Sequence, residues 1–289
     1  MSSIKPWKEL TFTDDYMFKK TMEAIDICME TLNAFLPWNI KRIAYFEEEK
    51  PLQAFYDSKG VRLDVYIHDE AERIYDVEMQ VRKMREKLGV DAMESLAKRC
   101  RFYLGQLDAD FLQKGAIYSD LRPTIIIFFC PFPLFDGKRS VYPFRHLCTK
   151  DPSIALPDDA EILLITSKGD RKGLSETACA LLDYMDGIVS KHPLVQKIEK
   201  RIHTVKQNEQ EERDYMTYEM RIREERADAR AEGKAEGKAE GKAEGIAEKA
   251  FHTICNQLKR HVPYQDIASD NEVSIDEVIR IAKESHLTY

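Results

Sequence analysis

The sequence contains no paired cysteine motif and no long hydrophobic run. Its six cysteines are scattered, with no CxxC pair and no Cys/His cluster, which argues against a zinc module or a disulfide framework and favours a reducing compartment. The N-terminus lacks an apolar signal core, and the longest strongly apolar run, residues 125–130, is far too short to span a bilayer. We therefore expect a soluble cytoplasmic protein with no membrane partner.

An excess of basic residues is absent as well. The chain carries 44 Lys and Arg against 51 Asp and Glu, a formal net charge of −7. Contact with nucleic-acid phosphates needs a basic footprint, so the charge argues mildly against a nucleic-acid binder, although a local basic patch can still serve. With 289 residues, of which 43% are hydrophobic, the chain is long enough for one large globular domain and an appendage.

Two stretches of alternating polar and apolar residues, 61–67 and 75–81, flank a polar turn, and this period of two predicts a β-hairpin. If the strands pair about Ala71, Asp64 lies opposite Glu78. A shift by two residues would keep the same faces, whereas a shift by one would bury the acids. Carboxylates on neighbouring strands lie about 5 Å apart at Cβ and repel each other. A divalent cation such as Mg²⁺ would turn this repulsion into a binding site. The solvent-exposed face of an amphipathic hairpin explains the same pattern.

Three short motifs carry a resemblance to a known family. They are Arg62-Leu63-Asp64, Val77-Glu78-Met79-Gln80 and Arg99-Cys100-Arg101-Phe102-Tyr103. Together they resemble the PD-(D/E)xK nuclease family transposases, the Rpn-like recombination-promoting nucleases, in the variant where Gln replaces the motif Lys. The similarity extends from about residue 12 to the long helix near residue 220.

The resemblance implies a divalent-metal-dependent DNA endonuclease associated with recombination or transposition. Its catalytic residues would be Asp64, Glu78 and Gln80. Mg²⁺ or Mn²⁺ would be held by Asp64, Glu78 and the main-chain carbonyl of Met79. Gln80 would orient the attacking water or the scissile phosphate without contributing a charge, and the expected partner is DNA.

Five further residues have supporting roles under this resemblance. Asp15, in Asp15-Tyr-Met-Phe-Lys19, resembles a family motif that adds a third, weaker carboxylate, although an acid there also complements a helix dipole. Arg62 would steer a phosphate, and Arg82 would help to neutralise the transition state. Phosphate binding is expected of Arg99 and Arg101, for which a solvated helix face is the alternative.

The remaining pattern predicts a three-layer α/β domain over residues 1–193. We expect one helix with Thr13 as its N-cap that continues to Phe35, and an acidic loop at 47–49 between two short strands. A helix is expected around 96–111, a fully buried strand at 123–130, another strand at 161–166 and a helix at 175–185. With the family resemblance, this implies a restriction-endonuclease-like core, a mixed sheet flanked by helices.

Three segments are expected after the core: a long charged helix (194–232), a low-complexity tether of Gly-Lys-Ala-Glu repeats (233–245) and a small helical module (246–289). The repeat places like charges at i,i+4 and a Gly in every turn, which predicts a weak helix or a flexible tether. The last module resembles a helix-turn-helix. Because its basic residues are sparse, an interaction module that forms homo-oligomers through the C-terminal helices is an equal alternative.

A second function class is a non-catalytic DNA- or protein-binding adaptor of mobile elements that keeps the nuclease fold. The acidic net charge and the missing motif Lys favour the adaptor. The intact set of Asp64, Glu78 and Gln80 favours the enzyme.

Overall fold

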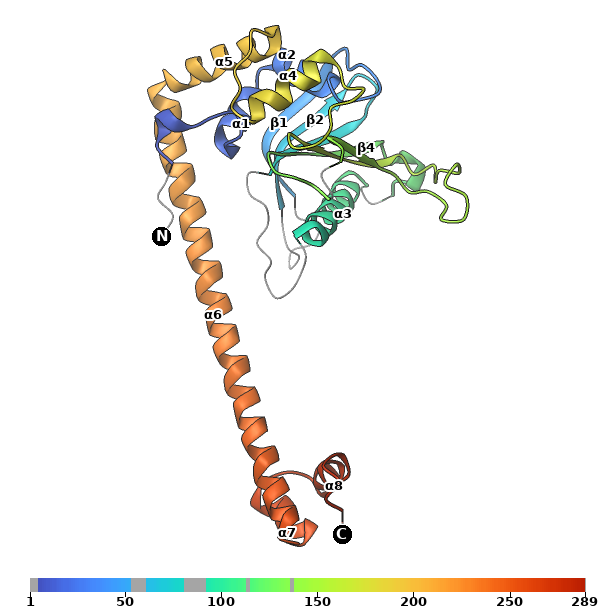
Figure 1. Cartoon of the computed structure of the whole chain (residues 1–289), viewed down its shortest axis with the longest axis vertical. Helices are drawn as coiled ribbons and strands as arrows, with labels where there is room; N and C mark the ends of the chain where they lie inside the picture. The colour runs from blue at the N-terminus through green and yellow to red at the C-terminus, as the bar shows by residue number, and fades with distance from the viewer. Residues whose placement is uncertain (1–4, 53–60, 81–91, 113–114, 136–137, 289) are drawn as a thin grey trace. The chain divides into compact units, whose positions relative to one another are not determined.

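A mixed sheet forms the centre of the domain that precedes the long helix α6 (Figure 1). The computed structural model describes residues 5–52, 61–80, 92–112, 115–135 and 138–288. Within these ranges six strands are ordered β1-β2-β3-β4-β6-β5, with β3, β4 and β6 parallel and the other neighbouring pairs antiparallel. The strands are β1 (Ile43–Leu52), β2 (Val61–Asp69), β3 (Ile74–Met79), β4 (Thr124–Cys130), β5 (Val141–Phe144) and β6 (Ala160–Thr166).

Helices cover both faces of this sheet, which gives the expected three layers (Figure 1). The helices are α1 (Asp15–Met22), α2 (Ile25–Asn33), α3 (Ala92–Phe111), α4 (Glu176–Met185), α5 (Pro193–Lys206), α6 (Glu209–Lys259), α7 (Tyr264–Asp270) and α8 (Ile275–Glu284). The described residues include no helix with the length and apolar character needed to cross a membrane.

Strand β4 shows how the layers divide, because successive side chains of a strand point to opposite faces. The ring of Phe128 lies 6.3 Å from that of Tyr103 on α3, whereas the ring of Phe129 lies 6.0 Å from that of Phe18 on α1. All seven residues of β4 are buried, as expected for a central strand.

The β2–β3 hairpin has the register that the alternation predicts. Its pairs are Val65↔Val77, Tyr66↔Asp76, Ile67↔Tyr75 and His68↔Ile74, all centred on Ala71. Continued by one residue, the same register places Asp64 opposite Glu78. However, this polar face is not exposed to solvent, because α3 packs over the sheet and leaves Glu78 only 2% exposed.

The prediction of a single N-terminal helix from Thr13 to Phe35 is wrong, because the structure has two helices there, α1 and α2. Asp14, not Thr13, is the N-cap of α1, and its carboxylate accepts hydrogen bonds from the Thr11 N–H (2.7 Å) and hydroxyl (2.9 Å). Arg201 of α5 donates to the Lys20 carbonyl at 2.9 Å. A continuous helix would use that carbonyl for the Ala24 N–H, which here donates to Thr21 instead.

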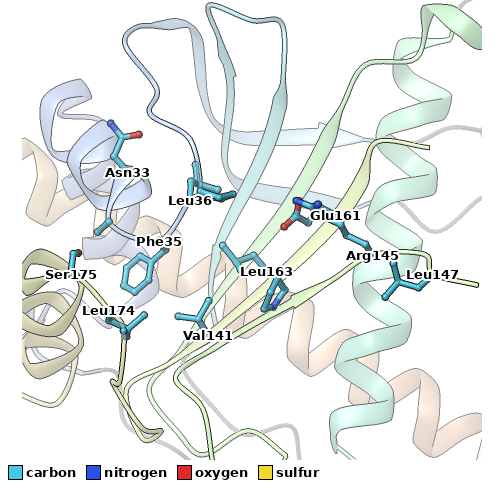
Figure 2. Close-up of a pocket in the computed structure, with 14 residues that line it drawn as sticks. Asn33, Phe35, Leu36, Val141, Arg145, Leu147, Glu161, Leu163, Leu174 and Ser175 are labelled. Atoms are coloured by element: carbon cyan, nitrogen blue, oxygen red, sulfur yellow. The ribbon is translucent and has the colours of Figure 1, made fainter. Parts of the chain in front are cut away.

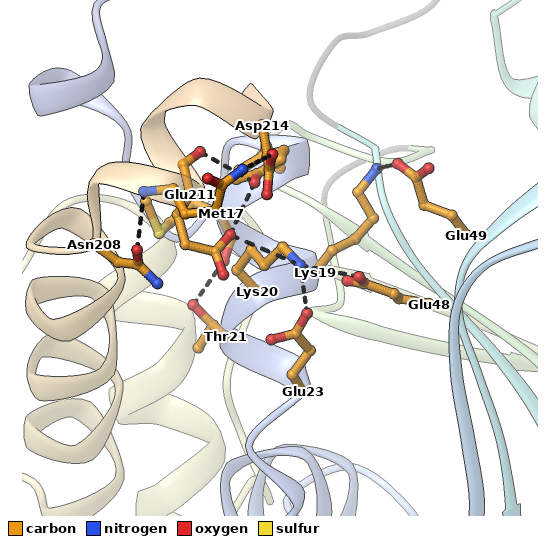
Figure 3. Close-up of polar contacts among 12 residues, drawn as sticks. Met17, Lys19, Lys20, Thr21, Glu23, Glu48, Glu49, Asn208, Glu211 and Asp214 are labelled. Atoms are coloured by element: carbon orange, nitrogen blue, oxygen red, sulfur yellow. Dashed lines mark hydrogen bonds and ion pairs between the residues drawn. The ribbon is translucent and has the colours of Figure 1, made fainter. Parts of the chain in front are cut away.

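The acidic run at 47–49 is not a loop but part of β1. Glu47 and Glu48 pair with Tyr66 and Val65 of β2. Lysines of α1 neutralise the run, since Lys20 lies 2.9 Å from Glu48 and Lys19 lies 2.9 Å from Glu49 (Figure 3). The short strand expected at 53–56 lies outside the described residues.

The long helix expected from residue 194 is divided at 207–208 into α5 and α6. The N-terminal part packs onto the core, because α5 buries Leu194, Val195, Ile198, Ile202 and Val205. The side chain of Asn208 accepts from the Gln210 N–H at 2.9 Å and so stabilises the start of α6. The Gly-Lys-Ala-Glu repeat is helical within α6.

The chain forms two compact units, Met1–Tyr215 and Met216–Tyr289. In the second unit the end of α6 forms a small core with α7 and α8, built from Ile254, Leu258, Ile267, Val278 and Ile281. Ser274 caps α8 by accepting from the Glu277 N–H at 3.2 Å, as its sequence spacing indicates. Oligomerisation through these helices remains a prediction.

Candidate active site

The site is organised by Asp64, the fourth residue of β2, and Glu78, the last residue but one of β3. The Asp64 N–H donates to Glu78 Oε1 at 3.0 Å, and the Met79 N–H donates to Asp64 Oδ2 at 3.3 Å. Each carboxylate therefore accepts from the main chain of the opposite strand, just beyond the Val65↔Val77 pair. These exchanged hydrogen bonds hold the two acids beside each other, as the hairpin register predicts.

Arg99 of α3 joins this pair to Gln80. Its guanidinium donates to Glu78 Oε2 through Nη2, to Gln80 Oε1 through Nη1 at 2.8 Å, and to the Tyr103 hydroxyl through Nε at 2.8 Å. The guanidinium carbon also lies 4.9 Å from the ring centroids of both Tyr103 and Phe128. Arg99 is therefore held in one position, with its charge directed at Glu78.

The structure separates the two arginines expected to bind phosphate. Arg99 is partly buried in the site, whereas Arg101 is exposed on the surface of α3. Residues two positions apart on a helix do not share a face, because each residue turns the helix by about 100°. Of the pair, only Arg99 is placed with Asp64, Glu78 and Gln80.

The other supporting residues lie nearer to β1. Arg62 is exposed, and its Nη1 is 3.6 Å from Glu49 Oε2. Asp15 Oδ2 is 3.2 Å from Lys19 Nζ, and its negative charge is among the causes that raise the pKa of both Asp64 and Glu78. The role of Asp15 as a third, weaker carboxylate stays a prediction. Arg82 lies outside the described residues.

Asp76 is a site residue that the sequence analysis missed. It is completely buried two residues before Glu78 on β3, so both side chains point to the same face. Neither of its carboxylate oxygens has a hydrogen-bond partner among the described residues. In the sequence, the alternation of Asp76 with Val77 indicates that Asp76 shares a face with Glu78. Only the packing of α3 shows that this acid is buried.

All three carboxyl groups have a pKa well above the usual range. Burial is the largest cause for Asp64, Asp76 and Glu78, because it disfavours the charged form. The next cause is a neighbouring acid, namely Glu78 for Asp64, Asp64 for Asp76, and Asp76 for Glu78. The positive charge of Arg99 lowers the pKa of Asp76 and Glu78 without reversing these shifts.

This donor set suits a divalent cation. The described residues include no group of three or more His, Cys, Asp or Glu side chains already arranged to hold a metal ion. However, buried, mutually repelling carboxylates and the unpartnered oxygens of Asp76 are groups that a hard cation would satisfy. The residues present therefore fit the metal that the sequence resemblance implies.

The raised pKa values predict how stability depends on pH. In the folded protein the three carboxyls keep protons at pH values where unfolded carboxyls, with a pKa near 4, have lost them. The free energy of unfolding should then fall as pH rises above about 4 and through the folded-state pKa values, by up to about 1.4 kcal/mol per pH unit for each retained proton.

Thermal melts in EDTA at pH 5.5 and pH 8 test this prediction. We expect the lower Tm at pH 8, a smaller pH difference in Asp76→Asn, and a higher Tm when Mn²⁺ is added at pH 8, because the ion binds only the folded site. An equal Tm at both pH values in EDTA would contradict the prediction.

A pocket of about 700 Å³ is lined by none of the predicted site residues (Figure 2). It is formed by residues 33–37 at the end of α2, by β5 and β6, and by the start of α4. Leu163 of β6 lines it, whereas the next residue, Leu164, packs in the α3 cluster on the opposite face of the sheet. The pocket is therefore not part of the Asp64 and Glu78 site.

A mixed sheet flanked by helices, with Asp64 on β2, Glu78 on β3 and Gln80 directly after β3, is typical of the restriction-endonuclease-like PD-(D/E)XK class. Residues 12–232 match the family described as PD-(D/E)XK nuclease family transposase, and the chain belongs to this family. The resemblance seen in the sequence motifs is thus confirmed. No curated protein and no solved structure matches the chain.

Proposed function

We propose that this protein is a divalent-metal-dependent DNA endonuclease that hydrolyses phosphodiester bonds in recombination or transposition. The observation that supports it most is a pair of hydrogen bonds, from the Asp64 N–H to Glu78 and from the Met79 N–H to Asp64, because they hold the two carboxylates together on adjacent strands. Membership of a nuclease family supports the same reaction class.

Asp64, Glu78 and the main-chain carbonyl of Met79 would hold Mg²⁺ or Mn²⁺. When bound, such an ion polarises a phosphoryl oxygen and lowers the pKa of the attacking water. The protein supplies orientation: Arg99 donates to Oε1 of Gln80, which fixes the amide with its NH₂ group as the donor. That donor would orient the water or the scissile phosphate.

The adaptor function remains a second candidate because of the ion pair between Arg99 and Glu78. Arg99 already neutralises Glu78 within the protein, as a purely structural ion pair would. Incubation of plasmid DNA with the protein and Mg²⁺ or Mn²⁺, beside an EDTA control, separates the two functions. Metal-dependent nicking supports the nuclease, and DNA binding without nicking supports the adaptor.

Two substitutions of Gln80 test its role. Gln80→Lys restores the commoner motif and places an ammonium near the growing negative charge, so we expect a folded protein that retains at least part of the Mg²⁺-dependent cleavage. Gln80→Leu keeps the approximate volume but removes the amide, so cleavage should fall by about 10²-fold or more while DNA binding is kept. Rates of plasmid nicking and DNA-binding titrations provide both measurements. Equal cleavage by Gln80→Leu and the wild type would exclude Gln80 from the mechanism.

A further inference from the structure

A buried lysine lies beside the proposed active site. Lys19 of α1 is only 4% exposed, and its Nζ lies 2.9 Å from Glu49 Oε1 and 3.2 Å from Asp15 Oδ2. Figure 3 shows its side chain extending to Glu49, apart from the neighbouring Lys20, whose ammonium is bound by Glu23 and Glu48. Burial of an ammonium is unfavourable unless it is paired, and these carboxylates provide the pairing.

The position of Glu49 connects Lys19 to the acid pair. Strand β1 pairs Glu48 with Val65 and Lys50 with Leu63, so Glu49 occupies the position opposite Asp64. By the hairpin register Asp64 is itself opposite Glu78. By register, three acids therefore occupy adjacent positions on three strands, with the cation of Lys19 beside Glu49 and that of Arg99 beside Glu78.

The backbone at Glu49, the residue that contacts Lys19, is strained. Its φ is 53°, in the left-handed region that non-glycine residues seldom adopt. Such strain is concentrated at functional sites, where the surrounding contacts maintain it. Here the contacts of the Glu49 carboxylate include the cations of Lys19 and Arg62.

The motif position itself supplies no positive charge, because it is occupied by Gln80. On the premise of the proposed nuclease function, we propose that Lys19 provides the positive charge that the motif lysine would otherwise bring to the scissile phosphate. The Lys19 side chain comes from a different element, α1, but contacts Glu49, which is opposite Asp64 in the register of β1 and β2. In agreement, the charge of Lys19 lowers the pKa of Asp64, against the larger opposing effects of burial, Glu78 and Asp15.

The test compares Lys19→Met with Lys19→Arg and with Lys20→Met as a matched control. Lys20 is the next residue of α1 and is also bound by carboxylates, but it lies in the separate group of Glu23, Glu48 and Glu211. Mn²⁺ binding is measured by calorimetry without DNA, cleavage by plasmid nicking, and folding by thermal melts.

We expect Lys19→Met to slow cleavage by about 10²–10³-fold, the usual effect of losing a preorganised group at a developing charge. The same variant should bind Mn²⁺ more tightly, by roughly tenfold, because a cation has been removed from beside the carboxylates. Lys19→Arg should recover part of the cleavage, and Lys20→Met should cleave and bind Mn²⁺ like the wild type.

Unchanged cleavage by Lys19→Met, in an assay where the wild type cleaves, would overturn the role of Lys19 and leave the nuclease function standing. A parallel loss of Mn²⁺ binding and cleavage would assign Lys19 a purely structural role and also overturn it. Absence of metal-dependent cleavage by the wild type would overturn both proposals.

Discussion

Replacement of Asp64 by asparagine should abolish Mg²⁺-dependent nicking of plasmid DNA, with a rate loss of about 10³-fold or more, since metal-assisted hydrolysis depends on the ion and its ligands. The substitution keeps the size of the side chain and an oxygen that can accept from the Met79 N–H, a contact of 3.3 Å in the structure. It removes the negative charge that a divalent cation needs. Loss of activity without loss of the fold would therefore show that the negative charge of Asp64 is needed for cleavage.

Asp64→Ala provides the comparison. It deletes the proposed metal ligand together with the hydrogen bond to Met79, so cleavage should again be lost. Its thermal stability should change little, because loss of one hydrogen bond, worth about 1 kcal/mol, is offset by removal of a like-charge contact with Glu78. Nicking rates with Mg²⁺ and with EDTA, beside melts of both variants, give the result. Full activity of either purified variant would remove Asp64 from the metal site.

The second large effect is expected at Arg99. Arg99→Leu leaves Glu78, which is 2% exposed, without its cationic partner. Removal of one member of a buried ion pair typically costs about 3–5 kcal/mol, because the remaining charge is uncompensated. We expect a loss of that size in the free energy of unfolding at pH 8 in EDTA, measured by urea denaturation.

Arg101→Leu is the matched control, since this exposed arginine lies two residues further along the same helix. It should change stability by no more than about 0.5 kcal/mol. Lowering the pH should restore part of the stability of Arg99→Leu, because protonation of Glu78 removes the unpaired charge. An equal loss in the two variants would show that the Arg99 contact with Glu78 contributes little.

The sequence alone determined the hairpin and the parity of its strand pairing. Alternation at 61–67 and 75–81 fixes which side chains share a face, because a one-residue slip would transfer every side chain to the other face. The structure pairs the strands about Ala71, one of the registers that this pattern allows. The proximity of Asp64 and Glu78, on which the family resemblance also rests, could therefore be predicted without coordinates.

Local signals also determined several other elements. The apolar run of β4 indicated a strand buried on both faces, and Ser274 with Glu277 indicated the start of α8. These predictions succeed because their causes lie within a few residues, in a hydrophobic period or a cap. The continuous helices were predicted less well: at the break after α1 the Lys20 carbonyl accepts from Arg201, a residue distant in sequence.

Only the tertiary structure decided which charged residues belong to the site. Arg99 and Arg101 have similar local sequence signals, but the packing of α3 on the sheet directs one to Glu78 and leaves the other exposed. The same packing buries Asp76, and the packing of α1 against β1 and β2 brings Lys19 to Glu49. The physical reason is that local sequence fixes the face of an element on which a side chain lies, whereas burial and ion pairing depend on the distant element that covers that face.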